Sequence, residues 1–62
     1  MLTKREKEVL NLVLMAKTNK QIAKDLNISS DTVNAHLDHI FTKYEVHSRI
    51  ELIIKLYKNN LI

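Results

Sequence analysis

The clearest pattern of apolar positions lies in residues 30–44, where they recur at the spacing of one helix face. Intervals of four, three and four residues separate the members of this stripe, Val33, Leu37, Ile40 and Tyr44. These intervals predict an amphipathic helix. A shorter apolar group precedes it and predicts another helix, at Ile22, Ala23 and Leu26. Asn27-Ile28-Ser29 predicts the turn between them, because Asn tolerates a left-handed backbone and Ile28 can fill the space between the helices.

Two helices joined by so short a turn have the layout of a helix-turn-helix, whose second helix reads DNA. Small and polar residues occupy the face opposite the apolar stripe: Asp31, Asn34, Ala35, Asp38, His39 and Thr42. A helix that packs on one side and is slender and polar on the other fits a major groove.

Three Ser/Thr-x-x-Glu/Gln tetrads predict capping boxes, and therefore helix starts. They begin at Thr3, Thr18 and Ser48, and Ser29 or Ser30 is expected to start the helix that ends at Tyr44. The other long helices are expected over 4–15 and 49–58. The chain contains no Gly and no Pro, which strands joined by tight turns usually need. The predicted fold is therefore all-α, with four helices in a single domain, 1–62.

The two outer helices carry apolar residues on more than one side. In 4–15 the expected inner face, flanked by Leu10 and Leu14, is Val9, Leu12, Val13 and Ala16. In 49–58 the expected inner face is Ile50, Ile53, Ile54 and Tyr57. Leu52 and Leu56 then lie on the opposite side, and because a helix apolar on both sides should be buried on both sides, they are predicted to form a dimer interface.

Composition narrows the class of protein. A domain of 62 residues buries only about 60% of the surface of its unfolded chain, so its core is small and its helix caps matter. The chain has no Cys, which fits a cytoplasmic protein, no apolar run long enough to span a membrane, and no signal-peptide pattern. The formal net charge of +3 favours an anionic partner.

Four segments together resemble the LuxR/NarL/GerE-type DNA-binding domain: LTKREKEVL, TNKQIAKDLNIS, TVNAHLDHI and KYEVHSRIE. The resemblance runs from about Leu2 to Leu61. It implies a four-helix domain of a transcription regulator, with the third helix as the recognition helix and the fourth as the dimerisation element. The family often has Gly where this chain has Ala16 and Glu45, and a basic or small residue where it has Asp38.

The resemblance also implies roles for residues of this chain. Base contacts are expected from Asn34, Ala35 and Asp38, with Asn able to pair with adenine, the Ala methyl able to contact thymine, and Asp able to accept from cytosine N4. Phosphate contacts are expected from Thr18, Lys20, Ser30, Thr32, His36 and Lys43. The expected partners are double-stranded DNA, a second copy of the chain and RNA polymerase, with no membrane and no small-molecule ligand.

Other functions remain open. A helical protein-interaction module that keeps the fold but has lost DNA binding is the main alternative, and Asp38 and the modest charge support it. A domain like region four of a sigma factor shares the helix-turn-helix, but the segment KYEVHSRIE argues against it.

His36 and His39 lie three residues apart without an evident third ligand, so no metal or other cofactor is expected. No Gly-rich loop, Cys nucleophile or hydroxyl-His-acid set predicts an enzyme. The chain is expected to be either a stand-alone regulator or a piece of a longer one.

Overall fold

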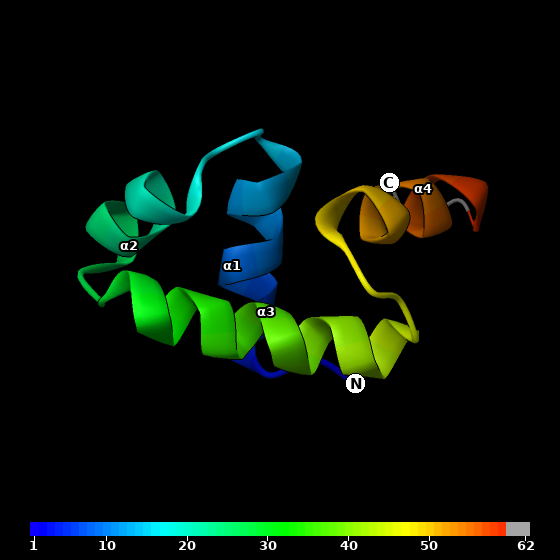
Figure 1. Ribbon diagram of the computed structural model, residues 1–62, viewed down its shortest axis with the longest axis horizontal. Coiled ribbons are helices and arrows are strands. Elements are labelled where there is room, and N and C mark those ends of the chain that lie inside the picture. Colours follow the sequence, from blue (N-terminus) through cyan, green and yellow to red (C-terminus); the bar gives the residue numbers. More distant parts are fainter. Residues whose placement is uncertain (60–62) are drawn as a thin grey trace.

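The computed structural model describes residues 1–59 and contains four helices, α1 (Lys4–Leu14), α2 (Asn19–Leu26), α3 (Ser30–Tyr44) and α4 (Arg49–Lys58). Figure 1 shows α3 running along one side of the molecule, with α1 crossing behind it, α2 at its N-terminal end and α4 above its C-terminal end. The predicted all-α, four-helix fold is confirmed. The last three residues of the predicted domain, 60–62, lie outside the described residues. Within 1–59 no helix is both long enough and apolar enough to cross a membrane.

Each helix begins at a hydroxyl residue that accepts from a backbone amide of the first turn. The boxes at Thr3 and Thr18 are complete, with both the hydroxyl and the reciprocal Glu or Gln contact present. Ser29 caps α3 and Ser48 caps α4. The predicted box at Ser48 is only half formed: the Ser48 hydroxyl accepts from the Glu51 amide, but the Glu51 carboxylate faces the amide of His47 at 3.4 Å.

Three connections turn through the left-handed region of backbone conformation without using glycine. Ala16, Asn27 and Glu45 have φ values of 62°, 56° and 57°. Asn27 ends α2 in this way, as predicted. The prediction for Ala16 is wrong, because this residue lies beyond the end of α1 and is exposed instead of belonging to its inner face. A left-handed residue reverses the chain within a single position, which makes the short connection between α1 and α2 possible.

The core forms where α1 and α2 both pack on α3. The predicted α3 stripe is confirmed, since Val33, Leu37 and Ile40 are buried and Tyr44 is half-buried. α1 contributes Val9, Leu10 and Val13, whereas Leu12 is only half-buried. α2 contributes buried Ile22 and Ala23, and Ile28 of the turn packs against the core as predicted.

The predicted orientation of α4 is wrong. Leu52 and Leu56, assigned to a dimer interface, are 0% and 1% exposed and belong to the core of the chain itself. Of the predicted inner face only Ile53 packs against the core, whereas the other three are exposed: Ile50 at 70%, Ile54 at 48% and Tyr57 at 73%. Both stripes recur at helical spacing, so periodicity alone could not decide between them.

Polar contacts at the connection between α3 and α4 help to set the orientation of α4. The Lys55 ammonium donates to the backbone carbonyl of Tyr44 at 2.6 Å, at the end of α3, where carbonyls lack helical partners. The backbone amide of Val46 donates to the Phe41 carbonyl at 2.9 Å and completes the turn. Lys55 therefore joins the end of one helix to the side of the next.

The corrected orientation predicts opposite outcomes for two neighbouring apolar residues. Leu56→Ala should lower the free energy of unfolding by about 2–5 kcal/mol, because it leaves a cavity in the core. Ile54→Ala, which shortens a side chain that is 48% exposed, should change it by about 0.5 kcal/mol or less. Urea unfolding of both variants measures the difference. Equal losses would show that α4 is rotated relative to this description.

Candidate nucleic-acid interface

The outer face of α3 carries the three residues predicted to contact bases. Asn34, Ala35 and Asp38 are all exposed, while Val33 and Leu37 between them are buried. The buried stripe packs α3 against the core and leaves the three outward residues exposed. This arrangement presents a slender polar ridge, as insertion into a major groove requires.

The N-terminus of α2 lies beside this face and contacts it directly. The side-chain amide of Asn19 donates to the Asn34 carbonyl oxygen at 2.6 Å. The Arg49 guanidinium, from the start of α4, donates to the Asn19 carbonyl oxygen at 3.0 Å and to the backbone carbonyl of Lys17 at 3.2 Å. Residues from three helices therefore meet at the edge of the exposed face.

The residues predicted to contact phosphate do not all lie together. Lys20 and Ser30 are exposed near the N-termini of α2 and α3. The Thr18 hydroxyl caps α2, and the Thr32 hydroxyl is 2.9 Å from that of Ser29, so both have partners within the chain. His36 is half-buried.

Lys43 lies on the other flank of α3 and is paired within the chain. It follows Asn34 by nine residues, which at roughly 100° per residue places the two half a turn apart around the helix. Its ammonium donates to the Glu6 carboxylate at 2.6 Å and to the Met1 carbonyl at 3.1 Å. Lys43 thus ties α3 to the start of α1.

Glu6 is the one buried charged residue of the described chain, with 3% of its surface exposed. The hydrogen bond from Lys43 lowers the pKa of Glu6 from 4.5 to about 2, assisted by the backbone amide of Thr3 and opposed by burial. The carboxylate is thus ionised and paired across the normal pH range. This pair fixes α3 to α1 by charge as well as by packing.

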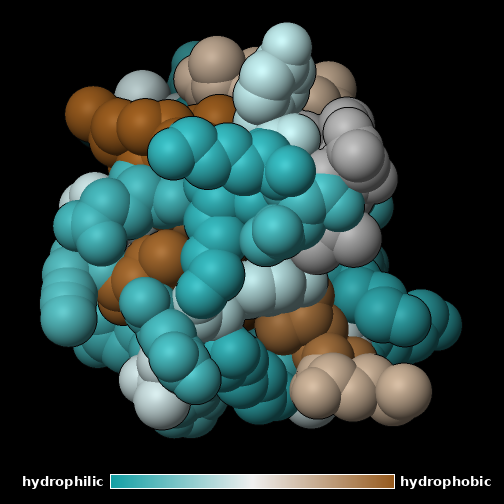
Figure 2. Space-filling model, turned by 90° about the vertical axis from the view of Figure 1, so that its right-hand side faces the viewer, coloured by the Kyte–Doolittle hydropathy of each residue, from teal (hydrophilic) through white to brown (hydrophobic). Residues whose placement is uncertain are grey.

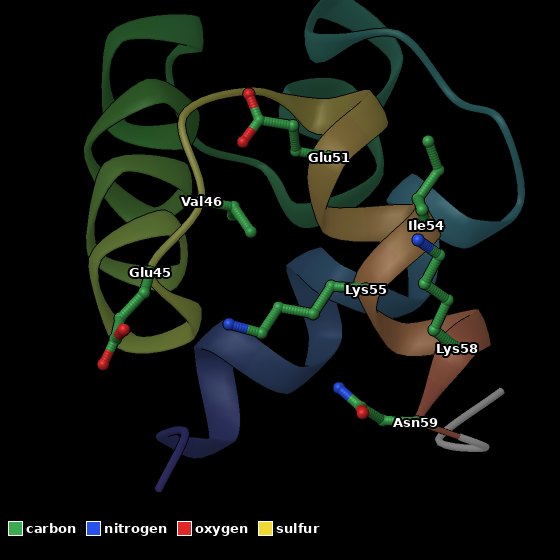
Figure 3. A pocket seen from close by; sticks show the side chains of 7 residues that line it. All are labelled: Glu45, Val46, Glu51, Ile54, Lys55, Lys58 and Asn59. Atoms are coloured by element: carbon green, nitrogen blue, oxygen red, sulfur yellow. The ribbon is translucent and has the colours of Figure 1, made fainter.

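The described residues contain no cluster of three or more groups that could hold a metal ion. An open hollow of about 430 Å³ lies between the α3–α4 connection and α4, away from the Asn34 face. Figure 3 shows that acidic Glu45 and Glu51 and basic Lys55 and Lys58 all line it. Because these charges are mixed and Lys55 is bonded to a backbone carbonyl, the hollow has no consistent preference for a charged ligand.

Comparison with known proteins identifies the family. The family model described as bacterial regulatory proteins, luxR family, matches residues 1–56. The chain belongs to this family. The LuxR family is one of regulatory proteins, not of enzymes.

Several relatives of this LuxR-family chain are regulators. It is 39% identical over 61 residues to the transcriptional regulatory protein LiaR of Bacillus subtilis, covering 98% of this chain and 29% of that protein. It is 50% identical over 54 residues to the transcriptional regulatory protein DesR of the same organism, covering 87% and 27%. It is 52% identical over 52 residues to the uncharacterized response regulatory protein YgeK of Escherichia coli, covering 84% and 35%. The chain therefore spans about a third or less of the length of these relatives.

Sequence reasoning missed two residues of this LuxR-family surface, Asn19 and Arg49. One signal could have revealed Arg49, because it is the first residue of α4. A cation at a helix N-terminus is unfavourable with respect to the helix dipole, so Arg there calls for acceptors elsewhere. Its acceptors are Asn19 and the Lys17 carbonyl.

The Glu6–Lys43 pair predicts a pH-dependent part of the stability. Since the pKa of Glu6 is lower in the folded state, its contribution is complete above about pH 4.5 and is lost as the pH falls towards 2. Glu6→Gln keeps a side-chain acceptor for the capping box but removes the charge. The difference in melting temperature between wild type and variant should thus be largest near neutral pH and shrink between pH 4.5 and 2.

Circular dichroism melts from pH 2 to 7 measure this difference. Glu8→Gln is the matched control, since Glu8 is an exposed carboxylate 3.9 Å from Arg5. That variant should shift the melting temperature little at any pH, because exposed ion pairs contribute little. If wild type and Glu6→Gln differ in melting temperature by the same amount at pH 2 and pH 7, the assigned role of the Glu6 charge is contradicted.

Proposed function

We propose that this chain is the sequence-specific DNA-binding part of a cytoplasmic transcription regulator, and that it inserts α3 into the major groove. The observation that carries this proposal is the exposed face formed by Asn34, Ala35 and Asp38 on a helix whose opposite stripe is buried. Membership of the LuxR family and the regulatory relatives support it.

Phosphate contacts would come mainly from the N-terminal ends of α2 and α3. Exposed Lys20 supplies charge, and the first-turn amides of both helices suit an anion. Thr18, Ser30 and Thr32 can add hydroxyls, and His36 can add a ring nitrogen. Lys43 contributes less in this proposal, because its ammonium is already bonded to Glu6.

Acidic Asp38 on the outer face restricts which DNA can bind. A carboxylate repels phosphate, but in the groove it can accept a hydrogen bond from cytosine N4. The same residue supports the alternative of a protein-interaction module without DNA binding. Binding to duplex DNA, and its salt dependence, distinguishes the two functions.

A second copy of the chain would pair with the first through the exposed face of α4. With Leu52 and Leu56 buried, the available apolar residues are Ile50, Ile54 and Tyr57, which follow one another at helical spacing. Figure 2 views the side of the molecule that carries α4, where hydrophobic groups are interrupted by hydrophilic ones. So limited a patch favours weak pairing that forms when two copies occupy adjacent half-sites on DNA.

The division between phosphate and base contacts gives a test on DNA. Lys20→Ala should weaken binding to all sequences alike and lower the slope of log K against log salt by about one, because one fewer counterion is released. Asn34→Ala should weaken binding to the preferred site by about 1–3 kcal/mol and flatten the preference at one base pair. Fluorescence anisotropy at several salt concentrations measures both.

The same titrations test the alternative function. Wild-type protein that fails to bind random duplex DNA at low salt would overturn the DNA-binding proposal and leave the protein-interaction module. If Lys20→Ala and Asn34→Ala change the affinity, salt slope and base preference in the same way, the assignment of Lys20 to phosphate and Asn34 to bases is wrong.

The role of α4 is tested by adding a charge to its exposed face. Ile54→Lys should leave the fold and binding to a single half-site intact, because the side chain is 48% exposed, and should abolish cooperative binding to a paired site. Met15→Lys is the matched control, since Met15 is 65% exposed and lies at the end of α1. Gel-shift titrations on single and paired sites measure the cooperativity, and undiminished cooperativity in Ile54→Lys would exclude this face as the contact between copies.

A further inference from the structure

Arg49, Asn19 and Asn34 form a chain of hydrogen bonds that has a direction. The Arg49 guanidinium donates to the Asn19 carbonyl oxygen at 3.0 Å, and the Asn19 amide nitrogen donates to the Asn34 carbonyl oxygen at 2.6 Å. The Asn34 amide nitrogen is the last group in this chain and makes no hydrogen bond within residues 1–59. Asn34 therefore presents its NH₂ group, a hydrogen-bond donor, on the exposed face of α3.

Arginine determines this direction because a guanidinium has donors and no acceptor. The Asn19 side chain must turn its oxygen towards Arg49, which turns its NH₂ group towards Asn34. Asn34 must then turn its own oxygen towards Asn19, since two NH₂ groups facing each other cannot bond. Neither amide can rotate while Arg49 is in place, because either rotation would set two donors against each other.

The position of Arg49 is itself held by the backbone. Its second guanidinium nitrogen donates to the Lys17 carbonyl at 3.2 Å, and the residue is only half-exposed at the first position of α4. Lys17 in turn pairs with Asp25 at 2.8 Å, which links the segment before α2 to α2 itself. The Arg49 guanidinium, which sets the direction, is therefore anchored to the backbone of the segment before α2 and not to α3.

Resting on the proposed function, we propose that Arg49 and Asn19 are positioning residues that make Asn34 a donor towards DNA, so that it selects guanine. Guanine presents two acceptors in the major groove, N7 and O6, which the two protons of an NH₂ group can meet. Adenine presents an acceptor and a donor, so reading both requires the Asn34 oxygen to face the base, whereas that oxygen is turned towards Asn19. Cytosine presents a donor at N4, which an outward NH₂ group cannot bond.

Asn19→Asp tests the proposal by reversing the direction. The carboxylate introduced by this substitution still accepts from Arg49. Because it has no donor to offer Asn34, the Asn34 side chain must rotate so that its NH₂ group faces the carboxylate and its oxygen faces outwards. An acid in the first turn of α2 also suits the helix dipole, so the fold should be retained. Gln21→Glu is the matched control: it makes the same amide-to-acid change in the same helical turn and keeps a residue suited to the capping box.

Selection from a randomised duplex library measures base preference for wild type and each variant, and the base pair at which Asn34→Ala loses preference marks the Asn34 contact. Wild type and Gln21→Glu should favour a G·C pair in one orientation there, over A·T and over the reversed pair, by about 10-fold or more. Asn19→Asp should favour an A·T pair or the reversed orientation of the G·C pair. A wild-type preference for an A·T pair there, or the same G·C preference in unchanged orientation in Asn19→Asp, would overturn the proposal.

A second measurement needs no DNA and separates this inference from the proposed function. In ¹⁵N-resolved NMR spectra of the uncomplexed protein, the Asn19 side-chain NH₂ protons should exchange slowly and those of Asn34 rapidly. In Asn19→Asp the Asn34 NH₂ protons should become protected. Rapid exchange at Asn19 and slow exchange at Asn34 in wild type would overturn the assigned direction, even if the protein binds DNA. If the exchange rates are as expected but the protein does not bind DNA, only the proposed function is overturned.

Discussion

The packing of the α3 stripe between α1 and α2 is the constraint on which the other features depend. Val33, Leu37 and Ile40 can be buried only with the opposite face of α3 turned outwards, so the core and the exposed polar face are two sides of one helix. Helices of this length are marginal in isolation, and tertiary burial supplies most of their stability. Changes that loosen the core are therefore expected to disturb the outer face as well.

Much of this arrangement could be predicted from the sequence. The hydroxyl caps marked the helix starts, the intervals in 30–44 fixed the inward face of α3, and Asn27 marked the turn. The orientation of α4 could not be predicted in this way, because Leu52 and Leu56 share their spacing with the Ile50–Ile54 pair. Tertiary contacts decide between such stripes, among them the bond from Lys55 to the end of α3 and the bonds from Arg49 to the start of α2.

Polar side chains hold both flanks of α3 where apolar packing ends. On one flank the buried Glu6 carboxylate accepts from Lys43, and on the other Asn34 accepts from Asn19. Neither pair could be assigned from the sequence, because their partners lie 37 and 15 residues apart and depend on how α1 and α2 pack. The predicted base-facing residues lie together on one face, whereas the predicted phosphate-facing residues are divided between the two flanks, and Lys43 is paired within the chain.

The left-handed turns at Ala16, Asn27 and Glu45 are formed in a chain that contains no glycine at all. A non-glycine residue in this region carries a steric cost in the folded state. The unfolded chain, however, also lacks the wide conformational freedom that glycine would give it, so less backbone entropy is lost on folding. Part of the stability of this small domain therefore comes from the lower conformational entropy of its unfolded chain, and not from contacts in the native structure.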